Sequence, residues 1–275
     1  MNLDDLPASQ DQWLTAVRRQ LRFYRKTWRF VGLLGFVLLV GVAGTAVSIA
    51  YNDAGTSASD YLSSLTGNLP TFGIIVCAFI GGDAIAMDFG SGTGYFMLVL
   101  PVRRIVLLLG RYTAAFLASF ALLLVFFAFG VFGDAWFYGV AAVPWLPLVE
   151  SIGLTALFAL AALSTAFFFS SFFRSPAVSM VVTILVLFLG FIILDGALTV
   201  TSVEPWFSLL YAGQAIALPF EGQPHETVLQ TMGRRGLTLH TWSPFIWEGA
   251  VIMVAYFVAF LVISAVLYQY KESKG

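Results

Sequence analysis

The chain has 275 residues, of which 59% are hydrophobic and 11% are charged, and its formal net charge is −1. Soluble domains carry about 25% charged residues. The composition therefore excludes an ordinary soluble protein and indicates an integral membrane protein. The single cysteine, Cys77, excludes an intrachain disulfide and a metal site built from several thiolates. No basic soluble face with interleaved aromatic residues is present, so nucleic acid is not an expected partner.

Residues 1–29 form a mostly polar segment ahead of the first apolar run. Within it, apolar residues recur every three or four positions from Trp13 to Trp28, and arginines that include Arg18 and Arg22 form a second stripe. This spacing predicts an amphipathic helix over residues 9–29. We expect the helix to lie in the cytosolic interface, with its aromatic side chains toward acyl chains and its arginines toward phosphates. The alternative is a basic flank that only sets the topology.

Six apolar runs are long enough to cross a bilayer as helices, which requires about 20 residues. Each run is longer than a strand of a membrane barrel, so helices are expected. The runs cover residues 30–50, 69–87, 105–132, 148–173, 177–194 and 244–270. The predicted fold class is an all-α integral membrane protein. Residues 1–29 would be a cytosolic tail with an interfacial elbow helix, and residues 30–275 would form the six-helix transmembrane domain.

The basic residues predict the orientation. Twelve of the fourteen lysines and arginines precede the first run, follow the last one, or lie in or beside the second-to-third and fourth-to-fifth connections. The other connections hold only Arg234 and Arg235, together with acidic residues that include Asp134 and Glu204. Because basic residues concentrate on the cytosolic side of membrane proteins, we expect a multi-pass protein of the cell membrane with both termini in the cytosol.

The longest external connection, residues 195–243, contains an apolar stretch over residues 205–220 that is too short to cross the bilayer comfortably. We expect this stretch to be a partly embedded element before the last span. The alternative is a surface helix that rests on the membrane.

Carboxylates lie near the ends of several runs rather than at their centres. Glu248 is close to Trp242 and Trp247, and Glu248 and Asp195 are candidates to line an exit path. Asp83, at the expected cytosolic end of the second run, is interpreted as an interface carboxylate. The spacing of the external histidines matches no standard metal site, so no metal is expected. No cluster of residues suited to catalysis is present, and we predict no catalytic residue.

Residues 88–111 concentrate small residues, a proline and three arginines between two apolar runs, with the sequence DFGSGTGYFMLVLPVRRIVLLLGR. The glycines at positions 90, 92 and 94 are similar to a phosphate-binding loop only superficially. A nucleotide loop would follow a strand and, in one version, end in Gly-Lys-Ser/Thr. Neither feature is present, so we expect no bound nucleotide and no cofactor in this chain.

The spacing within this segment resembles the first cytosolic loop of ABC-2 type transporter permeases. The matching positions are Asp88, Gly92-Thr93, Pro101-Val102, Arg104 and Gly110-Arg111. Asp88 stands where the family usually has glutamate, and Arg111 stands where lysine is more usual. The acidic residues that often precede Gly-Thr in the family are replaced here by Gly90 and Ser91.

The resemblance implies a permease subunit that moves or flips a substrate outward, driven by a separate ATP-hydrolysing subunit docked on this loop. The residues that would couple to the ATPase are Asp88, Gly92, Thr93, Pro101, Arg103 and Arg104. The implied partners are two ATPase copies, which would hold ATP and Mg²⁺, a second permease copy in a homodimer, and membrane lipid. A prokaryotic origin is expected.

The alternative is an ATPase-independent secondary transporter or channel, which predicts an internal repeat or charges at mid-membrane. A membrane-embedded enzyme would instead need a polar catalytic cluster at one interface.

Overall fold

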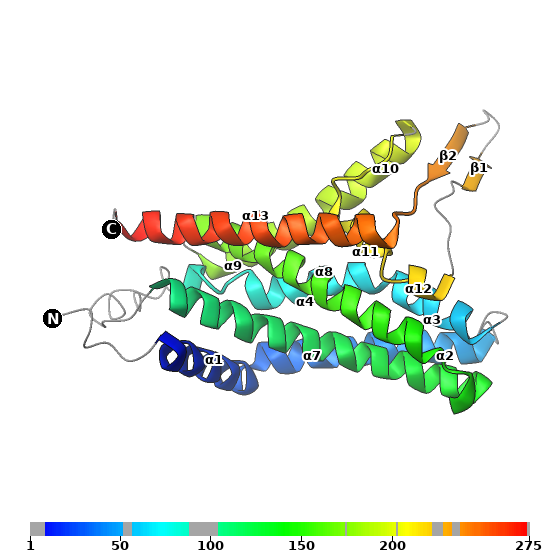
Figure 1. Ribbon diagram of the computed structural model, residues 1–275, viewed down its shortest axis with the longest axis horizontal. Helices are drawn as coiled ribbons and strands as arrows, with labels where there is room; N and C mark the ends of the chain where they lie inside the picture. Colours follow the sequence, from blue (N-terminus) through cyan, green and yellow to red (C-terminus); the bar gives the residue numbers. More distant parts are fainter. Residues whose placement is uncertain are drawn as a thin grey trace.

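The computed structural model describes residues 9–51, 57–87, 104–173, 175–201, 203–221, 228–232 and 237–273. The long helices run side by side as an elongated bundle (Figure 1). Helix α1 (Ser9–Lys26) and the last turns of α13 (Ile246–Ser273) lie at one end of the bundle. Helix α12 (Leu218–Glu221) and the antiparallel pair β1 (Val228–Met232) and β2 (Leu237–Thr241) lie at the other end.

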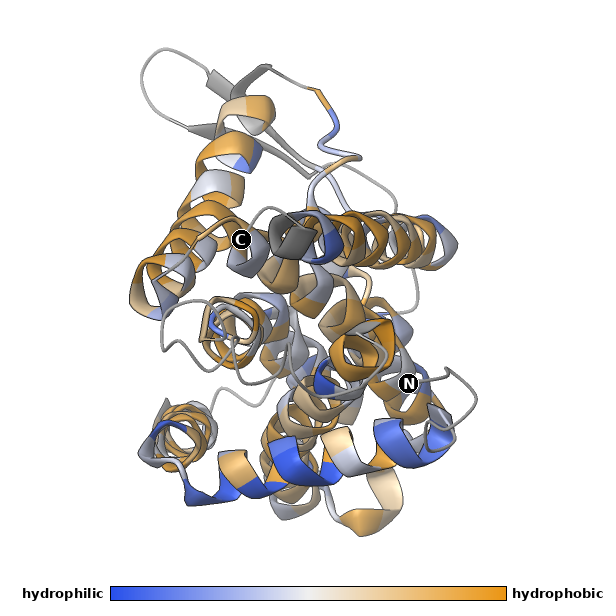
Figure 2. Cartoon of the chain, turned by 90° about the vertical axis from the view of Figure 1, so that its left-hand side faces the viewer, coloured by the Kyte–Doolittle hydropathy of each residue, from blue (hydrophilic) through white to orange (hydrophobic). Residues whose placement is uncertain are grey.

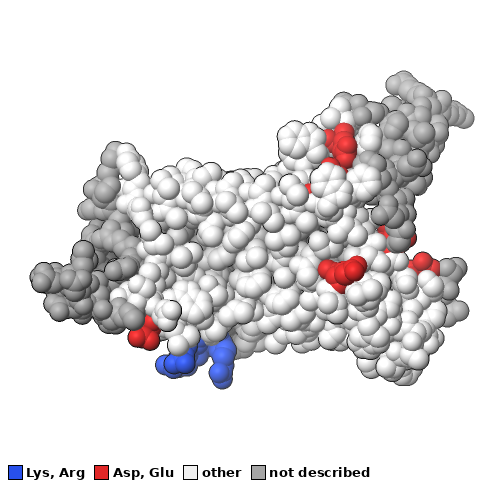
Figure 3. Space-filling model, in the orientation of Figure 1, with Lys and Arg blue, Asp and Glu red and all other residues white. Residues whose placement is uncertain are grey.

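Charge separates these two ends (Figure 3). We call the end with α1 the basic end, because it holds the described arginines and lysines from Arg18 to Arg29. The opposite end, which we call the acidic end, holds most of the described carboxylates. They are Asp60, Asp134, Glu150, Asp195, Glu204, Glu221 and Glu248. The described part of the chain therefore carries the charge asymmetry that the sequence predicts.

Five helical stretches are long and apolar enough to cross a membrane. They are α2 (Trp28–Tyr51), α7 (Arg104–Tyr138), α8 (Trp145–Phe172), the continuous stretch from α9 (Pro176–Ile184) through the π-helical turn η3 (Leu185–Gly190) to α10 (Phe191–Thr201), and α13. The bent pair α3 (Ala58–Gly67) and α4 (Leu69–Gly81) supplies a sixth span if it is counted as one. The predicted fold class, an all-α integral membrane protein, is confirmed.

The second span differs from the single run 69–87 that the sequence predicts. It begins eleven residues earlier, at Ala58, and bends by 40° where α3 gives way to α4. Pro70 lies in the first turn of α4. It has no N–H to continue the hydrogen bonding of α3, and proline is a common cause of such bends. The polar residues of α3 lower its hydropathy, so the sequence does not reveal this half of the span. Within the helix the Thr66 hydroxyl is satisfied, because it donates to the Leu62 carbonyl.

The third span is longer than the predicted run 105–132. Helix α7 continues to Tyr138 and ends where Gly139 takes a φ of 85°, a left-handed conformation that favours glycine at a helix C-terminus. The extension places Asp134 inside a helix. The sequence assigned this residue to an external connection, and that assignment is corrected: its side chain is fully buried.

Helix α8 lies at the centre of the bundle and packs against α4 and α13. Within its span 56% of the most apolar window is buried, compared with 11% for α13 and 22% for α2. The outer helices therefore expose apolar side chains around the bundle, as expected of surfaces that face lipid.

The apolar stretch 205–220 folds into the bundle. It forms the short helices α11 (Leu209–Gln214) and α12, in which Leu209 and Tyr211 are almost completely buried. Gly213 fits against Pro70 and Phe158, where an added Cβ would lie 2.6 Å from the Pro70 Cβ. The stretch therefore packs within the bundle, and its depth in the membrane stays a prediction.

Candidate functional site at the root of the 88–103 segment

Most of the predicted coupling residues lie outside the described residues: Asp88, Gly92, Thr93, Pro101 and Arg103. Arg104 is the first residue of α7, and only its backbone is described. The structure does describe the two places where this segment joins the bundle. We call them the loop root: residues 81–87, which are the last residue of α4 and the turn after it, and residues 104–111, which begin α7. The loop root is the candidate functional site.

Two adjacent glycines let the end of α4 fit between α8 and α9. At Gly81 an added Cβ would lie 3.0 Å from the Cβ of Ala166 on α8. At Gly82 it would lie 3.0 Å from the Cα of Met180 on α9. Carbon atoms pack at about 3.5–4.0 Å. Glycine at both positions is therefore what permits the two helices to approach this closely.

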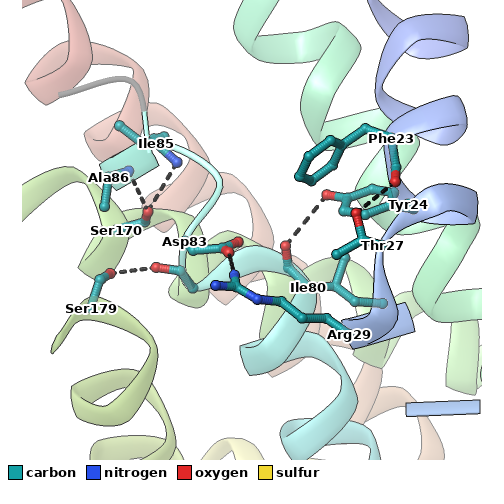
Figure 4. A network of polar contacts seen from close by, with 11 residues as sticks. Phe23, Tyr24, Thr27, Arg29, Ile80, Asp83, Ile85, Ala86, Ser170 and Ser179 are labelled. Carbon is teal, nitrogen blue, oxygen red and sulfur yellow. Dashed lines mark hydrogen bonds and ion pairs between the residues drawn. The ribbon is translucent and has the colours of Figure 1, made fainter. Parts of the chain in front are cut away.

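Hydroxyl groups from α8 and α9 bind the backbone of the same turn (Figure 4). The Ser170 Oγ accepts hydrogen bonds from the N–H groups of Ile85 and Ala86, each at 3.0 Å. The Ser179 hydroxyl donates to the Gly82 carbonyl. Both serines are fully buried. A chain leaving a helix has carbonyl groups without helical partners, and a buried polar group without a partner is costly. These serines therefore fix the path of the turn.

Two arginines add charged contacts to the turn. Arg29, at the start of α2, forms an ion pair with Asp83. The Arg111 guanidinium on α7 donates to the Ala84 carbonyl at 3.3 Å. The Asp83 side chain is only 9% exposed, whereas that of Arg29 is 52% exposed. The pair thus joins a buried carboxylate to a cation that keeps contact with solvent or headgroups.

Burial raises the pKa of the Asp83 carboxyl, and the nearby Arg29 guanidinium opposes that rise. Desolvation disfavours the charged form of an acid, whereas an adjacent cation favours it. Burial is the larger of the two effects here. Asp83 therefore depends on Arg29 to carry its charge in this position.

Helix α1 packs on the first turns of α7, which connects it to the loop root. An added Cβ at Gly110 would lie 2.7 Å from the Ala16 Cβ, so the two helices cross with little space between them. Trp13 packs partly buried against the core, and Tyr24 is buried with its hydroxyl 3.4 Å from the Ile80 carbonyl. These two aromatic side chains face the bundle, which differs from the expectation that they point toward acyl chains.

The remaining predicted residues of this helix face outward. Arg18 and Arg22 are exposed on α1, and Trp28, the first residue of α2, is 86% exposed. Figure 2 shows the hydrophilic residues of α1 along the outer side of the bundle. The outward position of these residues agrees with the predicted interfacial helix.

The two candidate exit-path residues have local contacts at the acidic end. The Glu248 carboxylate accepts a hydrogen bond from the Phe245 N–H at 3.2 Å, which is half of a capping box at the start of α13. Asp195 accepts a hydrogen bond from the Ser208 hydroxyl at 3.0 Å and so holds the chain that precedes α11. Their part in an exit path stays a prediction.

Sequence reasoning missed Ser170 and Ser179, which lie in or beside apolar helices and belong to no motif. It singled out Asp83 only as an interface carboxylate. The one available signal was position, since all three residues lie near the expected cytosolic ends of spans. No metal-binding group of three or more His, Cys, Asp or Glu residues occurs in the part of the chain that the structure describes.

The bundle of apolar spans defines the class as a multi-pass transmembrane protein. A family model described as "ABC-2 family transporter protein" matches residues 41–266, which is most of the chain. The chain therefore belongs to the ABC-2 transporter family and is a membrane component of an ABC transporter. No curated protein matches the chain.

Membership has two general consequences. Proteins of this family are membrane components that are generally not catalytic, and the family implies an ABC ATPase as a partner. The matched region includes the 88–103 segment and its root, whereas α1 lies before its first residue.

Proposed function

We propose that this chain is the permease of an ABC exporter in which a separate ATPase docks on the first cytosolic loop, residues 88–103. Two permease copies would form a homodimer in the cell membrane with their basic ends in the cytosol. Two ATPase copies, holding ATP and Mg²⁺, would lie beneath them. A substrate would be moved or flipped outward.

One observation carries this proposal: the loop root is bonded to several helices at once. Force applied to a loop reaches the spans only if the loop joins them through stiff contacts. The turn after α4 is bonded to α8 through Ser170, to α9 through Ser179 and to α2 through the Arg29–Asp83 pair. A push on the 88–103 segment would therefore act on three other spans together with α4.

The coupling roles of Asp88, Gly92, Thr93, Pro101, Arg103 and Arg104 rest on their spacing in the sequence. Pro101 and the glycines would set the bend into a short coupling helix, and Arg103 and Arg104 would contact the ATPase. The loop root supports these roles because hydrogen bonds and an ion pair hold both ends of the segment against neighbouring helices.

The test is to purify the full-length chain from its host and to identify what remains bound. We expect a soluble ATPase in a fixed ratio to the permease. A preparation that transports without any ATPase would support the alternative, an ATPase-independent secondary transporter or channel, and would overturn the proposal.

Docking on the loop itself needs a finer experiment. Replacing Gly92 or Pro101 with a bulky residue is expected to leave the bundle folded and the ATPase active, while transport per ATP hydrolysed falls sharply. The matched control is Gly153→Ala on α8, where an added Cβ meets nothing within 4 Å. Unchanged transport in the loop variants would place the coupling element elsewhere.

A further inference from the structure

Helix α1 presents a face that the proposed transport cycle does not use. Its buried side packs on α7, and its opposite side is exposed and basic. The exposed basic residues of α1 are Arg18, Arg19, Arg22, Arg25 and Lys26. We call this set the basic face.

The spacing of the basic face makes it one continuous surface. Positions 18 and 22 are four residues apart, and positions 25 and 26 are three and four residues beyond 22. Residues at these separations are neighbours on a helix. Neighbouring like charges on a helix repel each other by a few tenths of a kcal/mol per pair. The arrangement is therefore unfavourable unless an external anion lies against it.

The chain offers little compensation of its own. Asp11 is the only acidic residue of α1, and it lies in the first turn. The one ion pair found among the described residues joins Arg29, which lies beyond α1, to Asp83. An anion from outside the described part of the chain would therefore stabilise the basic face.

Exposed apolar side chains beside these charges indicate what supplies that counter-charge. Leu14 is 40% exposed and Phe23 is 43% exposed on α1. Trp28 is 86% exposed at the residue where the first membrane span begins. Aromatic side chains also occur at protein interfaces, but the position of Trp28 at the start of a membrane span favours lipid. A lipid surface accommodates both kinds, because tryptophan and phenylalanine enter the headgroup boundary while arginines contact phosphates.

We propose that the basic face of α1 binds the headgroups of anionic phospholipids in the membrane that holds the bundle. The outer end of this surface reaches Arg29. That guanidinium keeps N–H donors beyond the one bonded to Asp83, so it can contact a lipid phosphate and the loop root at once. Lipid binding would thereby hold α1 and the start of α2 in place beside the loop root.

The full-length protein in neutral detergent is titrated with short-chain phosphatidylglycerol and with phosphatidylcholine of the same chain length, and binding is measured for each. Wild type is expected to prefer phosphatidylglycerol by more than about 25-fold, since each of several basic residues contributes about fivefold. A basic residue beside an anionic surface contributes about 1 kcal/mol, or about fivefold in affinity. The double variant R22Q/R25Q should thus bind phosphatidylglycerol about 25-fold more weakly, with phosphatidylcholine unaffected.

Two controls separate this effect from general loss of charge or of fold. R234Q/R235Q removes the same charge at positions that the sequence assigns to the opposite side, and it should leave the preference intact. R22K/R25K keeps the charge and should keep most of the preference. Raising the salt to 1 M should weaken the preference, because the screening length falls from about 8 Å to about 3 Å.

Three results would overturn the proposal. Wild type could bind the two lipids equally. R22Q/R25Q could behave like R234Q/R235Q. Alternatively, R22Q/R25Q could keep its preference for phosphatidylglycerol but no longer retain the ATPase, in which case the basic face would be a protein-docking surface.

Discussion

The two ends of the bundle each bury a carboxylate in a different way. At the basic end Asp83 is paired with Arg29, and the turn around it is bonded to α2, α7, α8 and α9. At the acidic end Asp134 is fully buried in α7, and neither of its carboxylate oxygens has a hydrogen-bond partner. Burying an acid without a partner is costly. The basic end therefore satisfies its polar groups, whereas the acidic end retains an unsatisfied one.

The other carboxylates at the acidic end differ from Asp83 in the kind of partner that they have. Its carboxylates accept hydrogen bonds from neutral hydroxyls, as Glu221 does from Ser63 and Glu204 does from Tyr211. Hydrogen bonds to a charged group contribute about 1.5–3 kcal/mol each. The basic end uses charge and convergent backbone contacts instead. This difference indicates that the basic end is built to stay rigid and that single changes should affect it more strongly.

The largest effect is expected for Gly82→Val at the basic end. The new side chain would meet the backbone of α9 at Met180, and the helices would have to separate. Overpacking of this kind costs about 1–3 kcal/mol. We expect a fall in thermal stability together with lower transport per ATP hydrolysed. Gly153→Val, which enters open space on α8, is the control. Equal loss in both variants would contradict a special fit at Gly82.

Ser170→Ala should have the next largest effect, because two buried N–H groups would lose their acceptor. An unsatisfied buried donor costs about 1–3 kcal/mol. The control is Ser264→Ala on α13, where the buried Oγ has no hydrogen-bond partner to lose. Thermal unfolding of the two variants measures the difference. If Ser264→Ala proved as damaging as Ser170→Ala, the hydrogen bonds at the loop root would not be the cause.

Removing Arg29 should cost about 1–3 kcal/mol, less than for a fully buried pair because Arg29 is half-exposed. Asp83→Asn should largely restore the stability of Arg29→Ala, because the double variant has no unpaired carboxylate. A double-mutant cycle in thermal stability measures this coupling. Independent, additive losses would mean that the pair contributes little.

The same pair predicts a pH dependence. Burial raises the folded-state pKa of Asp83, so protonation favours the folded state. Its contribution to stability is full below the unfolded pKa of about 3.9 and is lost as the pH rises through the raised value. Arg29→Ala removes the opposing charge, so the contribution should persist to higher pH. Thermal stability measured from pH 4 to pH 8, with Asp83→Asn as the insensitive control, tests the direction.

The smallest change is expected at the acidic end. Asp134→Asn removes a charge without breaking a hydrogen bond, so thermal stability should stay the same or rise by up to about 1 kcal/mol. A large loss of stability would show that Asp134 has a partner after all, and the contrast between the two ends would fail.

Sequence alone determined the class of this protein, because apolar runs of membrane length and one-sided basic residues depend only on composition along the chain. It also found the amphipathic helix and the spacing of the 88–111 segment, which agrees with the family match. It misjudged Ala58–Gly67, whose polar side chains mask a half-span, and Asp134, whose helix ends only at Gly139.

Only the tertiary structure decided what surrounds the loop root. Ser170 is 85 residues from Ile85 in the sequence. Ser179 is 97 residues from Gly82, and Arg29 is 54 residues from Asp83. No local pattern encodes contacts over such separations. They exist because Gly81 and Gly82 let α8 and α9 approach the end of α4, and that approach depends on the packing of the whole bundle.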